Sequence, residues 1–259
     1  MTLTAPPTAA VTGRDTARIS RLRAQLGFEL RFLLLRGENL LVNLLIPAGA
    51  LLAFGSLGSP PEGYDKSVDF LMLGVIALGM IGAGMVSMGV STGYERHYHV
   101  LKRLGATPLG RGELLLAKAG SIFVIQLVQV VLLALLATVF LDWSLPGRVW
   151  LAVPVLLAGS LCFASIGFLL AGRLSAEANM ALNNVLFIAF IALGGMLTPL
   201  DRLPSLVERL ASLLPGAAVT DCLRAVLAHG EVPALTDVAV VVVWTAVCAV
   251  AAARTFRWD

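Results

Sequence analysis

Two of the three histidines, His97 and His99, stand at a spacing where metal binding has to be considered. An H-x-H pair on a helix points its two imidazoles in different directions, and no third ligand lies near them in the sequence. The third histidine, His229, falls on the opposite side of the expected membrane topology. We therefore expect no metal site and no cofactor bound by this chain.

Nucleotide and hydrolytic chemistry also lack their motifs. Gly58 and Gly63 have the spacing of the two glycines in a G-x-x-x-x-G-K-[ST] phosphate loop, but Tyr64 stands where that loop needs lysine. No H-E-x-x-H occurs, and all three histidines lie outside the apolar stretches, so no serine–histidine pair forms at membrane depth. We expect no catalytic residues and a protein that is not an enzyme on its own.

The composition is that of a polytopic membrane protein. Of 259 residues, 58% are hydrophobic and 14% charged, and the mean hydropathy is +0.88. A soluble domain is about 45–50% apolar and about 25% charged, and it has too much surface to hide this excess. Six stretches are long and apolar enough for helices that cross about 30 Å of hydrocarbon, which predicts an all-α fold. They span about residues 40–57, 69–92, 114–141, 149–172, 180–200 and 234–253.

Basic residues favour one orientation of these spans. Fourteen of the nineteen Lys and Arg residues fall on one side, and by the positive-inside rule that side, with both termini, is cytoplasmic. They are Arg14, Arg18, Arg21, Arg23, Arg31, Arg36, Arg96, Lys102, Arg103, Arg111, Lys118, Arg173, Arg254 and Arg257.

Three segments outside the spans have patterns of their own. Residues 1–17 are expected to be a flexible cytoplasmic tail. Residues 18–36 form an amphipathic pattern, with an apolar stripe of Ile19, Leu22, Leu26, Leu30 and Leu33 and another face of Arg18, Arg21, Gln25 and Glu29. This pattern predicts a helix on the inner leaflet, which serves either as an anchor or as a lateral gate. Residues 201–229, punctuated by prolines, are too short in each piece to cross and suggest a re-entrant extracellular hairpin before the last span.

Between the second and third spans, residues 94–104 predict a short cytoplasmic helix that ends at Gly105 and Pro108. This segment either docks a soluble partner as a helix or is an ordinary solvated loop.

Within the spans, ionisable residues are expected only near the interfaces, at Asp69, Glu113 and Lys118. Glycines 79, 82, 84, 89 and 93 of the second span predict close helix packing. Polar side chains at depth line a substrate path or bond helices together: Asn43, Ser87, Gln126, Gln129, Asn183 and Asn184.

Two sequence blocks follow a family pattern. The first matches E-R-x-x-G-x-L-K-R-L-x-A-T-P-L through Glu95-Arg96, Leu101-Lys102-Arg103-Leu104 and Ala106-Thr107-Pro108-Leu109, with His99 at the usual glycine. The second runs Gly194-Gly195-Met196-Leu197-Thr198-Pro199-Leu200-Asp201-Arg202-Leu203-Pro204 and is followed by Leu213-Leu214-Pro215. In these blocks, and in their order among six spans, the chain resembles the permease subunits of ABC type-2 (ABC-2) exporters, which include drug and antibiotic export permeases.

The resemblance implies a six-span domain over residues 37–259 that pairs with an identical or related copy and docks two ABC ATPase subunits, which bind the ATP and Mg²⁺. It implies a coupling helix that contacts the ATPase through Glu95, Arg96, Leu101, Lys102, Arg103, Leu104, Thr107 and Pro108. It also implies an extracellular gate at Gly194, Gly195, Met196, Pro199, Leu200 and Pro204.

The expected function is export of a hydrophobic or amphipathic substrate, such as a drug, an antibiotic or a lipid-like molecule, across a bacterial cytoplasmic membrane by alternating access. No nucleic-acid partner is expected, because the positive charge belongs to the membrane flanks. Two alternatives remain open: a secondary carrier, which needs an essential buried ionisable residue, and a membrane scaffold that transports nothing.

Overall fold

The computed structural model describes residues 8–35, 37–55, 60–108, 110–144 and 149–255, with side chains from residue 19 onward except those of residues 37–40 and 42. Within these ranges the chain folds into helices joined by turns, and no strand occurs among the described residues. The all-helical prediction is confirmed for this part of the chain. Helices suit a bilayer because all their backbone groups are bonded within the segment.

Within the described part of the chain, five helical runs are long and apolar enough to cross a bilayer. The first, Ser67–His97, joins α3 (Ser67–Met80), the π-helical turn η1 (Ile81–Ser87) and α4 (Met88–His97). The others are α6 (Arg111–Leu141), α7 (Ala152–Arg173) with the short η2 (Val149–Leu151) before it, α8 (Ala176–Leu193) and α11 (Leu235–Thr255). These runs correspond to the second through sixth spans predicted from the sequence.

A sixth crossing has two candidates among the described residues. α2 (Gly37–Gly55) covers most of the first predicted span, and its apolar portion Asn43–Gly55 is shorter than a full crossing. α9 (Ser205–Ser212) and α10 (Pro215–Leu227) are apolar enough together, but they meet at an angle of 81°. Pro215 begins α10, where its missing N–H costs no helical hydrogen bond. This bent pair fits the predicted hairpin, and α2 stays the predicted first span.

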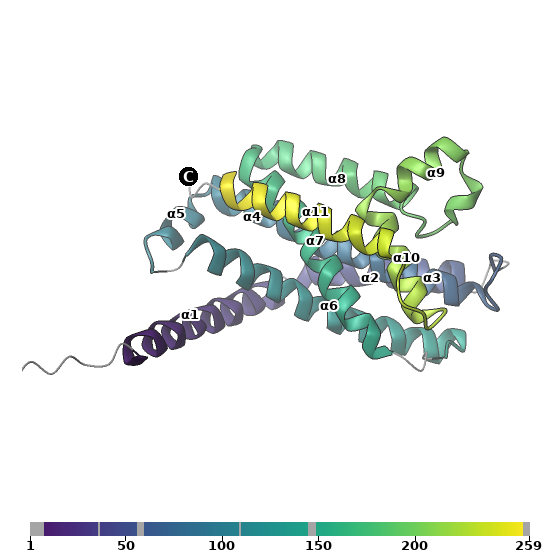
Figure 1. Ribbon diagram of the computed structural model, residues 1–259, viewed down its shortest axis with the longest axis horizontal. Coiled ribbons are helices and arrows are strands. Elements are labelled where there is room, and N and C mark those ends of the chain that lie inside the picture. The colour runs from purple at the N-terminus through teal and green to yellow at the C-terminus, as the bar shows by residue number, and fades with distance from the viewer. Residues whose placement is uncertain (1–7, 36, 56–59, 109, 145–148, 256–259) are drawn as a thin grey trace, which may run out of the picture.

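The helices form an elongated bundle whose two ends differ (Figure 1). The short helix α5 (Val100–Gly105) lies at the same end as the C-terminal end of α11, whereas α9 and α10 lie at the other end. α6 crosses the bundle obliquely, and α1 (Thr8–Leu35) projects beside it. The arrangement separates the predicted coupling segment from the predicted gate by the full length of the spans.

The α3–η1–α4 run is the centre of the bundle, since 83% of its most apolar 18-residue segment is buried. Its glycines are covered by neighbouring helices, as the packing prediction requires. A Cβ on Gly89 would lie 2.9 Å from the Cα of Gly167 on α7, and a Cβ on Gly84 would lie 3.1 Å from Phe163. The π-helical turn around Gly82 and Gly84 was not predicted. Such turns are rare and often mark functional positions within helices.

The N-terminal helix is longer than predicted. α1 begins at Thr8, ten residues before the expected start at residue 18, so the segment expected to be a flexible tail is partly helical. Residues 1–7 of that segment lie outside the described part of the chain. The helix ends at Leu35, close to the predicted end at residue 36.

Candidate functional site

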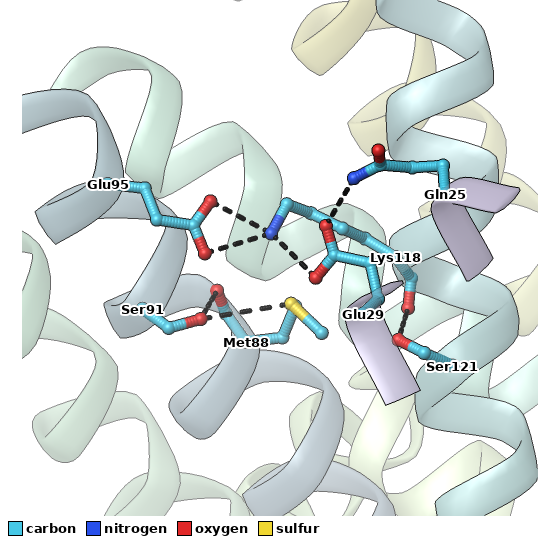
Figure 2. A network of polar contacts seen from close by, with 7 residues as sticks. All are labelled: Gln25, Glu29, Met88, Ser91, Glu95, Lys118 and Ser121. Atoms are coloured by element: carbon cyan, nitrogen blue, oxygen red, sulfur yellow. Dashed lines mark hydrogen bonds and ion pairs between the residues drawn. The ribbon is translucent and has the colours of Figure 1, made fainter. Parts of the chain in front are cut away.

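Lys118 on α6 is a charged side chain enclosed by the protein. It is fully buried and is one of the largest fully buried side chains among the described residues. Its Nζ lies 3.2 Å from Oε2 of Glu29 on α1 and 2.9 Å from Oε2 of Glu95 on α4. Figure 2 shows the two carboxylates reaching the ammonium from different helices, with the Gln25 amide donating to Glu29 at 2.9 Å. We call Glu29, Lys118 and Glu95 the buried triad.

The polar face of α1 packs against α6, with Glu29 buried and Arg21 and Gln25 half-buried. Arg21, Gln25 and Glu29 are spaced four apart and therefore share one face of the helix. Arg21 pairs with Glu113 on α6, its Nη2 lying 3.3 Å from Oε1, while Glu29 meets Lys118 on the same helix. The predicted polar face of the helix is therefore confirmed as one face, and α6 supplies ion-pair partners for Arg21 and Glu29, while Gln25 donates to Glu29 within α1. The Arg18 side chain lies outside the described residues.

Sequence reasoning missed the buried triad because it placed Lys118 near an interface and did not ask what faces it. A buried charge is stable only with close partners, and removing one partner is strongly destabilising. Two signals were available. Lys118 follows Leu114, Leu115 and Leu116 inside an apolar stretch, and Gln25 and Glu29 form a polar line on a helix that is otherwise Leu- and Phe-rich.

The chain turns sharply between α4 and α5. His99 adopts a left-handed backbone conformation with φ of +56°, at the position where the family pattern has glycine, the residue that tolerates this conformation best. The helix predicted over residues 94–104 is therefore two helices with a break at Tyr98 and His99. Leu101 at the start of α5 is fully buried and packs against Leu114 on α6.

The predicted coupling residues divide into two groups. Lys102, Arg103, Thr107 and Pro108 are exposed, and Leu104 is half-buried. The Glu95 carboxylate is bonded to Lys118, Arg96 donates to the backbone carbonyl of Leu174, and Leu101 anchors α5 on α6. The first group is available to a soluble partner, and the second holds the segment in place. Leu109, the last residue of the motif, is outside the described residues.

A cavity of about 650 Å³ opens beside the buried triad, among α1, α2, η1, α4, α5 and α8. Its volume lies in the range of small-molecule sites. Phe28 and Phe32 stack with ring centroids 6.2 Å apart, as do Tyr94 and Tyr98, and both pairs line the wall. The polar lining includes three residues of the predicted substrate path, Asn43, Ser87 and Asn184, and also Glu29 and Glu95 of the triad.

Comparison with known families identifies the family of the chain. A family model described as ABC-2 family transporter protein matches residues 47–254, which is most of the chain. The chain belongs to the ABC-2 transporter family. It is therefore a multi-pass membrane permease of an ABC transporter, a component that is generally not catalytic itself, and the family implies association with ABC ATPase subunits. No curated protein matches the chain.

The other deep amides of this ABC-2 permease bond helices to one another. The Gln129 amide donates to the Asn43 carbonyl at 3.0 Å, and the Gln126 amide donates to the Ile76 carbonyl at 3.5 Å. Asn183 donates to the carbonyl and side-chain oxygens of Asn179, which in turn donates to the Gly89 carbonyl at 2.9 Å. Gln126, Gln129 and Asn183 do not line the 650 Å³ cavity, so their contacts favour the packing interpretation.

At the far end of the permease, Arg224 on α10 organises the predicted gate. Its guanidinium donates to the carbonyl of Gly195, pairs with Asp221 at 3.2 Å and lies 4.1 Å from the ring centre of Phe70 on α3. Gly195 has a φ of +65°, and the neighbouring Met196 is fully buried. Gly194 is buried as well, Pro199 and Leu200 are half-buried, and Pro204 is exposed. Arg224 therefore ties the gate segment to α3 and α10.

Proposed function

We propose that this permease is the membrane subunit of an ATP-driven exporter for hydrophobic or amphipathic substrates. In this proposal two permease chains, identical or related, pair in a bacterial cytoplasmic membrane with both termini in the cytoplasm. Two ABC ATPase subunits bind the ATP and Mg²⁺ and drive alternating access. The family membership supports the class of transporter, and the arguments below support the finer statements.

The observation that carries the proposal is the placement of α5. It is a short helix at one end of the bundle, with Lys102 and Arg103 exposed and Leu101 buried against α6. A soluble ATPase needs a surface of this kind, charged outward and fixed to a span. The positive charge at this end is also what the positive-inside rule assigns to the cytoplasm.

The buried triad gives α5 a mechanical connection to the rest of the permease. Glu95 lies on the last turns of α4, directly before the break that leads into α5, and Lys118 joins it to α1 and α6. A displacement of α5 is therefore transmitted to three helices rather than absorbed by a flexible loop. Rigid elements that move together are a recurring way to convert binding at one site into motion at another.

The 650 Å³ cavity is the candidate entry site for the substrate. Its walls include α1, α4 and α5, which the triad and the coupling segment connect. Aromatic and aliphatic side chains dominate the lining, and Asn43, Ser87 and Asn184 supply a few polar contacts, a combination that suits an amphipathic molecule. The α9–α10 hairpin is the candidate closure at the other end.

Charge reversal on α5 tests the proposal. The double variant Lys102→Glu/Arg103→Glu changes only exposed side chains, so the fold is retained. We expect the candidate ATPase to bind the wild-type chain and to bind the variant at least tenfold more weakly, with a parallel loss of substrate-stimulated ATP hydrolysis. The matched control is Arg202→Glu/Arg209→Glu, which reverses two exposed charges at the opposite end. Equal ATPase retention by both double variants would exclude α5 as the docking element.

The buried triad also supplies the ionisable group that a secondary carrier requires, so transport must be measured under both driving forces. Proteoliposomes with the ATPase and ATP but no proton gradient should transport substrate. Transport that follows an imposed proton gradient and ignores ATP would replace the ATP-driven mechanism with a carrier mechanism.

A further inference from the structure

A second cavity, of about 880 Å³, lies at the α5 end of the bundle and is lined by basic side chains. Four arginines and two histidines face it, and no Asp or Glu occurs among the described residues that line it. They are Arg96, His97, His99, Arg111, Arg173 and Arg254. We call this cavity the basic hollow.

The basic residues come from helix ends that are distant in the sequence. Arg96 lies near the end of α4, Arg173 ends α7 and Arg254 lies in the last turn of α11, while Arg111 begins α6. Basic residues at the ends of membrane spans need only reach water, and that role does not require them to converge on one site. Their convergence on one hollow concentrates positive potential there, because charges that line a concave surface reinforce one another.

Helix dipoles explain only part of this cluster. A cation at the C-terminal end of a helix is favourable, which accounts for Arg96, Arg173 and Arg254. Arg111 stands at the N-terminal end of α6, where the dipole favours an anion instead. Ser175, the N-cap of α8, also lines the hollow, so the positive end of α8 lies there, whereas Glu113 already caps the start of α6. An anion in the hollow would thus be stabilised by the arginine side chains together with the N-terminus of α8.

We propose that the basic hollow binds the phosphate group of an anionic membrane lipid. Arginine pairs with phosphate oxygens through two parallel hydrogen bonds, and clustered arginines are suited to phosphate for that reason. The hollow lies at the ends of four apolar spans, which is the depth of the lipid headgroups. Basic pockets between helices on the cytoplasmic side are known sites for anionic headgroups. This inference does not depend on the ATPase or on the exported substrate.

The site is tested by lipid binding to the purified full chain. The chain is prepared in detergent and titrated with phosphatidylglycerol or with the zwitterionic phosphatidylcholine, and bound lipid is counted by native mass spectrometry. The test variant Arg173→Gln/Arg254→Gln removes two exposed cations of the hollow that lie outside the coupling motif. We expect at least a tenfold loss of phosphatidylglycerol affinity and no change for phosphatidylcholine.

The control variant Arg202→Gln/Arg209→Gln removes the same charge from the opposite end and should bind phosphatidylglycerol like the wild type. Equal binding of the two lipids by the wild type, or equal loss in both variants, would overturn the proposal. Inorganic phosphate distinguishes the source of the anion. If it fills the site with the affinity of the lipid, the hollow is a site for free phosphate and the lipid assignment is wrong. If the test variant keeps its lipid but loses the ATPase, the hollow is a protein-docking surface.

Discussion

Replacing Lys118 with methionine should destabilise the permease strongly. Methionine keeps an unbranched side chain of similar length and removes the charge, so Glu29 and Glu95 are left facing each other. The Glu29 side chain is only 4% exposed and the Glu95 side chain 13%, so water can reach the second carboxylate slightly and the first hardly at all. The variant therefore isolates the role of the shared cation.

The magnitude follows from the geometry of the buried triad. The two carboxylate oxygens lie 3.2 and 2.9 Å from the same Nζ, so they are at most about 6 Å apart. At an effective dielectric constant of about 20, two like charges at about 6 Å repel by about 3 kcal/mol. This agrees with the loss of about 3–5 kcal/mol that follows removal of one partner from a buried ion pair. A loss of about 3 kcal/mol corresponds to a Tm lowered by about 6–12 °C in a chain of this size.

Thermal unfolding of the purified full chain in one detergent, followed by circular dichroism, measures the effect. The matched control Lys102→Met removes an exposed lysine and should leave Tm unchanged. The triple variant Glu29→Gln/Glu95→Gln/Lys118→Met should recover most of the loss, since replacing a whole buried charge network is often neutral. A Tm of Lys118→Met equal to that of the wild type, or a triple variant no better than the single one, would refute the charge-pairing argument.

Three further predictions concern backbone strain, helix packing and the gate, and each is checked by the same unfolding measurement. His99→Gly should raise stability by about 1 kcal/mol because glycine adopts positive φ without steric cost, and an unchanged Tm would show that the turn relaxes. Gly89→Ala should lower the unfolding free energy by at least about 1 kcal/mol, because the added Cβ would clash with Gly167. The control Gly27→Ala, which has open space around it, should raise it by about 0.5–1 kcal/mol. Similar shifts for the two variants would contradict the packing argument. Arg224→Lys should cost about 2 kcal/mol, because a compact ammonium does not reproduce the planar guanidinium that donates to the Gly195 carbonyl through Nη2, to Asp221 through Nη1, and covers the Phe70 ring. Stability equal to that of the wild type would exclude this role.

Long apolar stretches were predictable because each carries its own signal. Five of the six predicted spans correspond to described helical runs that are long enough to cross, and α2 covers most of the sixth, since twenty apolar residues have few alternatives in a bilayer. The glycines of the second span were also interpreted correctly, because a residue without a side chain lets a neighbouring helix approach closely. Their partners, such as Gly167 for Gly89, could not be read from one segment.

The orientation of α1 was not predictable from its own residues. An amphipathic helix beside a membrane normally turns its polar face to water, and the polar line of Gln25 and Glu29 does not by itself indicate which residues it faces. The partners of this polar face, Lys118 and Glu113, are about ninety residues further along the chain. Pairwise contacts of that range depend on the tertiary arrangement, which the local pattern does not contain.

The position of Glu95 shows why a family motif and a contact surface differ. The resemblance assigns residues between Glu95 and Pro108 to ATPase coupling. A helix of six residues can transmit a displacement only if it is fixed to the spans. Glu95, Arg96 and Leu101 supply that attachment through Lys118, the Leu174 carbonyl and Leu114.

A motif of this kind therefore combines two requirements that a sequence pattern cannot separate. Lys102 and Arg103 satisfy the requirement for an exposed surface, and the three anchored residues satisfy the requirement for stiffness. On the proposed function, we expect loss of either to uncouple the ATPase, and we expect only loss of the anchors to lower the stability of the isolated chain as well. Binding and unfolding measured on the same variants therefore distinguish the two roles within one motif.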